Sequence, residues 1–205
     1  MRTLIGVDAP MTVRERRLLR LRHTFSGASL TPSDLGPAFE VAGGTATVSG
    51  GVLAQADATT LIVRTTPLAA NVVVQAKVNF GNSAGTARAV YVQPRHTEAT
   101  GNAVRARLDR TAQTLTIARL DAFTATTLAT VGSLSLADST WYTLRFSCSG
   151  STLRAQAFTA DGTLVAEAVV TEPLYVAQVG IRVALFDNVA SPQVTIDDLL
   201  VWMAP

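Results

Sequence analysis

The chain has 205 residues, of which 48% are hydrophobic and only 16% are charged, and its formal net charge is +2. This apolar, weakly charged composition excludes a disordered chain, and the length suits one large all-β domain or two small domains. A single cysteine, Cys148, excludes an internal disulfide, and with two histidines it leaves too few ligands for a zinc site without carboxylates.

Positive charge is concentrated at the start of the chain. Residues 1–22 contain six arginines and two acidic residues, whereas the remainder has a slight acidic excess. The segment lacks the apolar stretch of a signal peptide, and no later stretch has the roughly 20 apolar residues of a membrane span. We therefore expect a basic arm over residues 1–22 and a body over residues 23–205. The arginines expected to dock on a partner are Arg14, Arg16, Arg17, Arg20 and Arg22.

Three uses of the arm remain open: a solvated helix face, docking onto a larger partner, and contact with nucleic acid. Thr12 and Glu15 have the spacing of a capping box, which predicts the start of a short helix. Over residues 19–25, apolar and polar residues alternate with period two, which predicts that a strand follows.

The body is predicted to consist of short strands. Runs rich in Val, Thr, Ile and Leu are separated by turn residues about every ten residues, which is typical of a β-sandwich. The Asp161-Gly162 pair predicts a tight hairpin. The fold class is therefore all-β, a jelly-roll-like sandwich with a short N-terminal arm. The clearest runs cover residues 71–80, 87–93, 102–109, 114–120, 123–131, 141–148, 152–158, 165–170, 179–186 and 193–202.

Alternation within these runs separates core residues from exposed ones. In the run 141–148 one parity is apolar and includes Cys148, which we therefore expect to be a small buried hydrophobe. In the last run, Val194 and Ile196 share one parity while Leu199 and Val201 share the other. A β-bulge at Asp197 and Asp198 would return both halves to the core, because it inserts one extra residue.

The residues that catalysis needs do not form recognisable groups. Lys77 is the only lysine and lies in a strand-like run, which excludes a phosphate-binding loop. No catalytic motif surrounds His23 or His96, and His96 is expected to be a surface residue. The five glutamates do not form the carboxylate pair of a glycoside hydrolase. We therefore expect no enzyme activity and no cofactor, apart from a weak calcium signal.

Two sets of residues are candidates for binding. Arginines on the polar parity of several strands form a cationic stripe if their strands are neighbours in one sheet; otherwise they are a solvated face. Aromatic rings free for sugar stacking would complete a glycan site, whose candidate residues are Arg105, Arg107, Arg145, Arg154, Arg182, Trp141 and Tyr91. For calcium the candidates are Asp187, Asp197 and Asp198, although turn and bulge chemistry also accounts for them.

The order of several loose motifs resembles that of concanavalin A-like (laminin G-like) jelly-roll domains. The opening motifs are His23-Thr-Phe25-Ser, Leu35-Gly-Pro-Ala-Phe39 and Val48-Ser-Gly-Gly-Val52-Leu53. The later ones are Trp141-Tyr-Thr-Leu-Arg145, Val179-Gly-Ile-Arg182 and the stretch from Val194 to Val201. The Glu-x-Asp-x-x-Glu signature of the hydrolases in this superfamily is missing. The resemblance therefore implies a binding or structural sandwich over about residues 23–205.

Domains with this opening look similar to those of tailed-phage virion proteins of the minor tail, fibre or capsid-decoration kind. The expectation is a non-enzymatic virion structural protein, made in the host cytoplasm, that forms a homo-oligomer and docks on other virion proteins through its arm. The alternative is a carbohydrate-binding module that recognises a host surface glycan.

Overall fold

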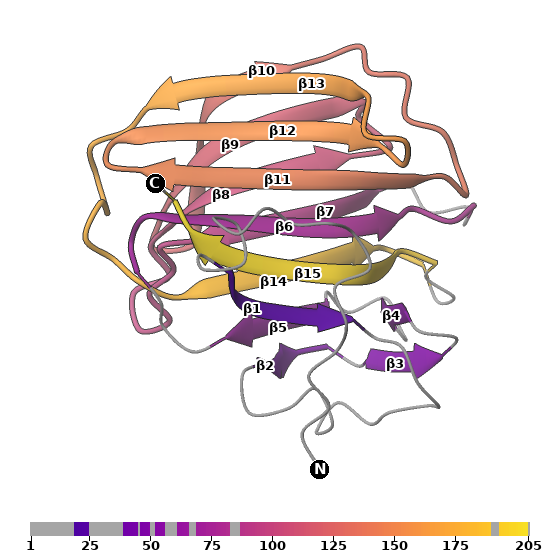
Figure 1. The fold of residues 1–205 in the computed structure, drawn as a ribbon, viewed down its shortest axis with the longest axis horizontal. Helices are drawn as coiled ribbons and strands as arrows, with labels where there is room; N and C mark the ends of the chain where they lie inside the picture. The colour runs from indigo at the N-terminus through magenta and orange to yellow at the C-terminus, as the bar shows by residue number, and fades with distance from the viewer. Residues whose placement is uncertain are drawn as a thin grey trace.

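The computed structural model of the protein describes residues 19–24, 39–44, 46–49, 52–55, 61–65, 69–82, 87–189 and 193–204. Within these ranges the secondary structure consists of strands, which form two antiparallel sheets stacked face to face (Figure 1). Nothing in these ranges forms an apolar helix of membrane-spanning length. The predicted all-β sandwich is confirmed.

Sheet A has eight strands. β1 (Leu19–Thr24) pairs with β15, and the other strands follow the spatial order β13 (Leu164–Thr171), β12 (Thr152–Thr159), β11 (Trp141–Ser149), β6 (Val72–Asn79), β15 (Thr195–Met203), β4 (Val52–Gln55) and β3 (Ala46–Ser49). Sheet B has seven strands in the order β10 (Thr124–Val131), β9 (Thr114–Asp121), β8 (Ala103–Asp109), β7 (Arg88–Pro94), β14 (Ile181–Asp187), β5 (Leu61–Thr65) and β2 (Phe39–Gly43).

All ten runs that the sequence singled out are strands, β6 to β15, with ends that differ by one or two residues. The predicted Asp161-Gly162 hairpin joins β12 to β13, where Gly162 has a φ of 86° and its N–H donates to the carbonyl of Thr159 at 3.0 Å. The strand expected from the alternation over residues 19–25 is β1. The helix expected at Thr12 lies outside the described residues.

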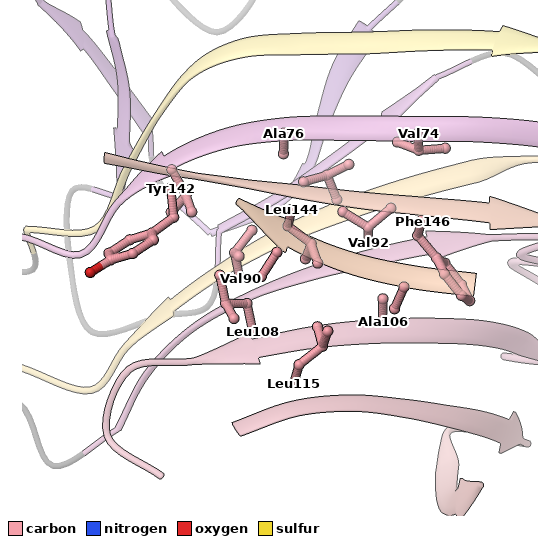
Figure 2. Packing of buried hydrophobic residues seen from close by; sticks show 14 of the residues in the cluster. Val74, Ala76, Val90, Val92, Ala106, Leu108, Leu115, Tyr142, Leu144 and Phe146 are labelled. Atoms are coloured by element: carbon pink, nitrogen blue, oxygen red, sulfur yellow. The ribbon is translucent and has the colours of Figure 1, made fainter. Parts of the chain in front are cut away.

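The core lies between the sheets and is made by the apolar parity of each strand. Figure 2 shows Val74 of β6 and Leu144 of β11 facing residues of sheet B such as Val92 and Leu108, and all four are fully buried. Cys148 is also fully buried, as predicted. Its surroundings raise the pKa of the thiol to about 12, because burial penalises the thiolate more than the nearby Arg95 cation favours it.

The predicted β-bulge is confirmed in β15. Ile196 pairs with Val78 of β6, but Leu199 pairs with Ala76, so β15 uses one residue more than its partner. Ile196 and Leu199 are 1% and 2% exposed, so both point into the core although they lie an odd number of positions apart. The extra residue reconciles the broken alternation with a single buried face.

The predicted boundary between arm and body falls inside a strand. β1 begins at Leu19 and pairs with β15, with Leu21 opposite Val201 and Arg22 opposite Leu200. β4 pairs with the other half of β15, through Leu53 and Ala54. The sheet therefore starts before residue 23, because the alternating segment hydrogen-bonds along the edge of β15 that β4 leaves open.

The two residues that follow β7, Arg95 and His96, are both buried. Arg95 is 1% exposed and donates to the carbonyl oxygens of Ala70 and Gly150 at 3.0 and 2.6 Å and to the Asn71 amide oxygen at 3.3 Å. The expectation that His96 is a surface residue is wrong, since it is 7% exposed. Its backbone N–H donates to Gly180 at 3.1 Å, which draws this loop against the segment before β14.

Candidate ligand-binding surface

The five outward arginines do not form one stripe. Arg145 on β11 and Arg154 on β12 belong to sheet A, whereas Arg105, Arg107 and Arg182 on β8 and β14 belong to sheet B. In each strand the neighbouring apolar residues face the core, so the two groups lie on opposite outer faces of the sandwich. The sequence gives the parity of each arginine, but which sheet it joins is decided by long-range strand pairing.

On the outer face of sheet A, Arg145 is fully engaged by its neighbours. Its Nε and Nη2 atoms donate to the amide oxygen of Gln75 at 3.0 and 2.8 Å. Its guanidinium carbon lies 5.1 Å from the ring centroid of Phe158 and 5.8 Å from that of Trp202. These are cation–π distances, so two of the rings on this face are used to hold an arginine.

The charged groups described on β6 and β12 of this face are also paired. Lys77 forms an ion pair with Asp197 at 2.6 Å and lies 4.9 Å from the ring centroid of Trp141. Arg154 is paired with Glu167 at 2.5 Å, and this contact lowers the pKa of the Glu167 carboxyl. On the outer face of sheet A, the cationic side chains Arg145, Lys77 and Arg154 therefore each have a partner within the protein.

The outer face of sheet B has a different character. Tyr91 and Gln93 of β7 lie beside Arg105, Arg107 and Asp109 of β8, and these five residues are here called the Tyr91 face. Tyr91 pairs directly with Arg107 and Val92 pairs with Ala106, so Gln93 and Arg105 are the next residues along the two strands. On the other side of β7, Gln93 pairs with Arg182 of β14.

Both arginines of the Tyr91 face lie near the tyrosine ring. The guanidinium carbons of Arg105 and Arg107 are 5.0 and 5.3 Å from the ring centroid. Arg107 also forms an ion pair with Asp109, which is itself only 2% exposed and accepts a hydrogen bond from the backbone N–H of Ala112 at 2.8 Å. Arg107 therefore has a counterion and Arg105 lacks one among the described residues.

Burial lowers the pKa of the Arg105 guanidinium from its ordinary value; Tyr91 opposes this shift, and the neighbouring Arg107 cation adds to it. The lowered pKa indicates that the charged guanidinium of Arg105 is partly desolvated and lies beside a second positive charge. An anion or a set of hydroxyl oxygens at this position would relieve both penalties.

Three polar groups of the Tyr91 face have no hydrogen-bond partner within the part of the chain that the structure describes. They are the guanidinium of Arg105, the hydroxyl of Tyr91 and the amide oxygen of Gln93. Gln93 is only 6% exposed, so its oxygen lacks both a partner in the protein and free access to bulk water. A guanidinium donor and a hydroxyl beside one aromatic ring provide what recognition of a sugar requires, whereas the buried Gln93 oxygen is out of a ligand's reach.

Sequence reasoning named Tyr91, Arg105, Arg107 and Arg182 but missed Gln93 and Asp109. Gln93 has the same parity as Tyr91 two residues earlier, and Asp109 has the same parity as Arg105 and Arg107. A search for all polar residues that share a parity with an outward aromatic ring would have found both.

The calcium candidates do not converge. Asp187 is buried at the end of β14, where its Oδ2 accepts a hydrogen bond from the Gln193 N–H at 3.0 Å. Asp197 is paired with Lys77, and Asp198 lies next to it at the bulge of β15. No group of three or more His, Cys, Asp or Glu side chains is placed to hold a metal ion in the described ranges.

Of the five arginines predicted to dock on a partner, only two lie within the described residues. Arg20 and Arg22 belong to β1, whereas Arg14, Arg16 and Arg17 lie outside the described residues.

Comparison with known proteins places the fold. No family model and no curated protein sequence matches the chain. Among solved structures, the carbohydrate-binding module CBM66 of Bacillus subtilis aligns with a TM-score of 0.55 at 12% identity, covering 90% of this chain and 96% of that one. The CBM2 module of the evolved Dit of Lactobacillus casei BL23 phage J-1 gives 0.63 at 12%, covering 91% and 96%. The fold is a concanavalin A-like jelly roll.

A third jelly roll of this kind, lectin II of Ulex europaeus, aligns with a TM-score of 0.59 at 13% identity and covers 90% of this chain and 97% of that one. The structural neighbours of this jelly roll thus include carbohydrate-binding modules and a lectin, and they span nearly the whole of both chains.

Proposed function

We propose that the protein is a carbohydrate-binding module that acts by binding rather than by catalysis, with its glycan on the Tyr91 face. The observation that carries the proposal is the Tyr91 ring with two polar groups that have no partner among the described residues, the Arg105 guanidinium beside the ring and the Tyr91 hydroxyl. Sugar hydroxyls both donate and accept hydrogen bonds, so they match this mixture. The likeness to carbohydrate-binding modules and a lectin supports it.

A glycan array read with purified protein, followed by titration of the best ligand, tests this proposal. Tyr91→Ala should lower the affinity about tenfold or more, because it removes both the ring and the hydroxyl. Tyr91→Phe should lose less, since the ring remains. Trp141→Ala is the matched control, because it removes an aromatic ring from the opposite face.

Two results would reject the proposal. One is the absence of binding to any glycan on the array by protein that is folded by circular dichroism. The other is a reversed pattern, in which Trp141→Ala abolishes binding and Tyr91→Ala leaves it unchanged. That pattern would move the site to sheet A.

A second candidate function is that of a virion structural protein, docked on other virion proteins through the basic segment and displaying the jelly roll as a homo-oligomer. It is supported by the likeness to a module of a phage protein. Because β1 belongs to sheet A, the segment to remove is residues 1–18 rather than 1–22. The truncated protein should keep its thermal unfolding transition but fail to enter particles; normal incorporation, scored by immunoblot of purified particles, would reject docking through this segment.

A further inference from the structure

The charge balance of the Tyr91 face points to the class of glycan. Two arginines, Arg105 and Arg107, lie on the outer side of β8, and the carboxylate of Asp109 on the same strand is bound to Arg107. Arg105 makes no hydrogen bond or ion pair with any described residue, and its Nε atom is buried. A guanidinium in this position is a vacant donor for a planar anion, because its fork matches a carboxylate or sulfate edge.

The outer face of sheet A provides an internal comparison. There Arg145 donates to Gln75, Arg154 to Glu167 and Lys77 to Asp197, so each cation has an acceptor from a neighbouring strand. The same chain thus pairs its surface cations on one side and leaves Arg105 without an acceptor on the other. A partly buried charge without a partner destabilises the fold. A ligand that supplies an acceptor for Arg105 would explain why the protein itself supplies none.

Neighbouring residues leave room for such a group. Across β8, Arg105 pairs with Ala118 and Arg107 pairs with Thr116 of β9, both short side chains. On the other side of β7, Tyr91 pairs with Ala184 of β14. Short side chains therefore border Arg105 and Arg107 on the β9 side and Tyr91 on the β14 side, while Arg182 borders Gln93.

We propose that the Tyr91 face binds an acidic glycan, with a carboxylate or sulfate group held by the guanidinium of Arg105 and a hydroxyl of the same sugar at the Tyr91 hydroxyl. The inference rests on the proposed carbohydrate-binding function and names its ligand class. The two anionic groups share one chemistry, that of a planar or forked oxyanion beside a desolvated arginine. Which of them is bound decides between uronic acid polymers and sulfated polymers.

The experiment compares glycans that differ only in charge. Oligogalacturonate is titrated against its fully methyl-esterified form, and κ-carrageenan oligosaccharides, which carry sulfate but no carboxylate, against their desulfated form, by calorimetry at low and at moderate salt. We expect the acidic member of one pair to bind about tenfold or more tightly, and the preference to shrink as salt rises. Arg105→Gln should reduce the preference to near one, whereas Arg105→Lys should keep part of it.

Arg154→Gln is the control substitution, because it removes a cation from the opposite face. All variants are checked for an unchanged thermal unfolding transition. If Arg105→Gln does not fold, the preference for the acidic glycan is measured on Arg105→Lys instead. Equal binding of the acidic and neutral members, abolished by Tyr91→Ala, would overturn the acidic class and leave the carbohydrate-binding function standing. An acid preference untouched by Arg105→Lys and Arg105→Gln would also overturn it.

Two further arms complete the test. Binding of single-stranded poly(dT) more tightly than any acidic glycan would overturn the inference in favour of a polyphosphate ligand. Failure to bind any of the four glycans or any glycan on the array would overturn the inference together with the function on which it rests.

Discussion

Arg95 donates a 2.6 Å hydrogen bond from Nη2 to the carbonyl oxygen of Gly150, in the turn that joins β11 to β12. The same side chain reaches the carbonyl of Ala70 before β6, so one residue after a strand of sheet B ties two segments of sheet A. No carboxylate accompanies it in the described part of the chain. Arg95 is therefore a structural cross-link between the sheets.

Replacing Arg95 by alanine should destabilise the protein by about 2–4 kcal/mol, because several hydrogen bonds from a charged donor are lost from a buried place. Urea unfolding followed by tryptophan fluorescence gives the free energy. Arg154→Ala is the matched control, and its exposed ion pair should contribute no more than about 1 kcal/mol. Equal urea midpoints for Arg95→Ala and Arg154→Ala would contradict the role of Arg95 as a cross-link between the sheets.

Deleting Asp198 should be far less damaging than deleting Leu200, although each deletion shortens β15 by one residue. Without Asp198, Ile196 and Leu199 lie two positions apart, so regular alternation keeps Leu199 and Val201 in the core and only the bulge is lost. Deleting Leu200 leaves the bulge in place and turns Val201 away from the core, which costs about 1.5–3 kcal/mol for that side chain. Urea midpoints of the two variants measure the difference, and a lower midpoint for the Asp198 deletion would refute the bulge.

Alkaline pH should destabilise the protein through Cys148. The thiol pKa is about 12 in the folded state against 9.0 ordinarily, so above pH 9 the unfolded chain releases a proton that the folded chain retains. This contribution is fully present below pH 9 and is lost at about 1.4 kcal/mol per pH unit as pH rises toward 12. Between pH 9 and 10.5 a Cys148→Ala variant should therefore lose less stability than the parent. Identical slopes for the two proteins would show that the thiol is accessible in the folded state.

Gly180→Ala should destabilise the fold more than Gly162→Ala, although both glycines have positive φ. A Cβ at position 180 would lie 2.5 Å from the carbonyl oxygen of His96, whereas nothing lies within 4 Å of one at position 162. The second change costs only backbone strain, about 1–2 kcal/mol, and the first adds a clash with main chain that cannot yield easily. Thermal melts of both variants measure the difference, and the reverse order would place His96 elsewhere.

The strands could be predicted from the sequence because their core residues alternate over seven or more positions. β11 is the clearest case, and the bulge of β15 follows from a single break in the same alternation. β3, with the sequence Ala-Thr-Val-Ser, and β4 have four residues each, too few for a period to be evident. Their pairing with each other and with β15 supplies what local propensity lacks.

The candidate site was predicted in its residue types but not in its location. Parity identifies Arg105 and Arg145 equally well as outward, yet one lies beside Tyr91 on sheet B and the other between Phe158 and Trp202 on sheet A. That difference comes from pairings between strands far apart in the chain, such as β6 with β11. The burial of His96 has the same origin, since its partner Gly180 is far along the chain.

The place of β15 also governs how the chain reaches its folded state. β15 inserts between β6 on one edge and both β1 and β4 on the other, so the middle of sheet A is completed by a strand that follows all of its neighbours in the sequence (Figure 1). Until β15 pairs with it, β6 has one unpaired edge. We therefore expect slow folding, on a timescale of roughly milliseconds to seconds, because the contacts that complete the sheet are mostly non-local.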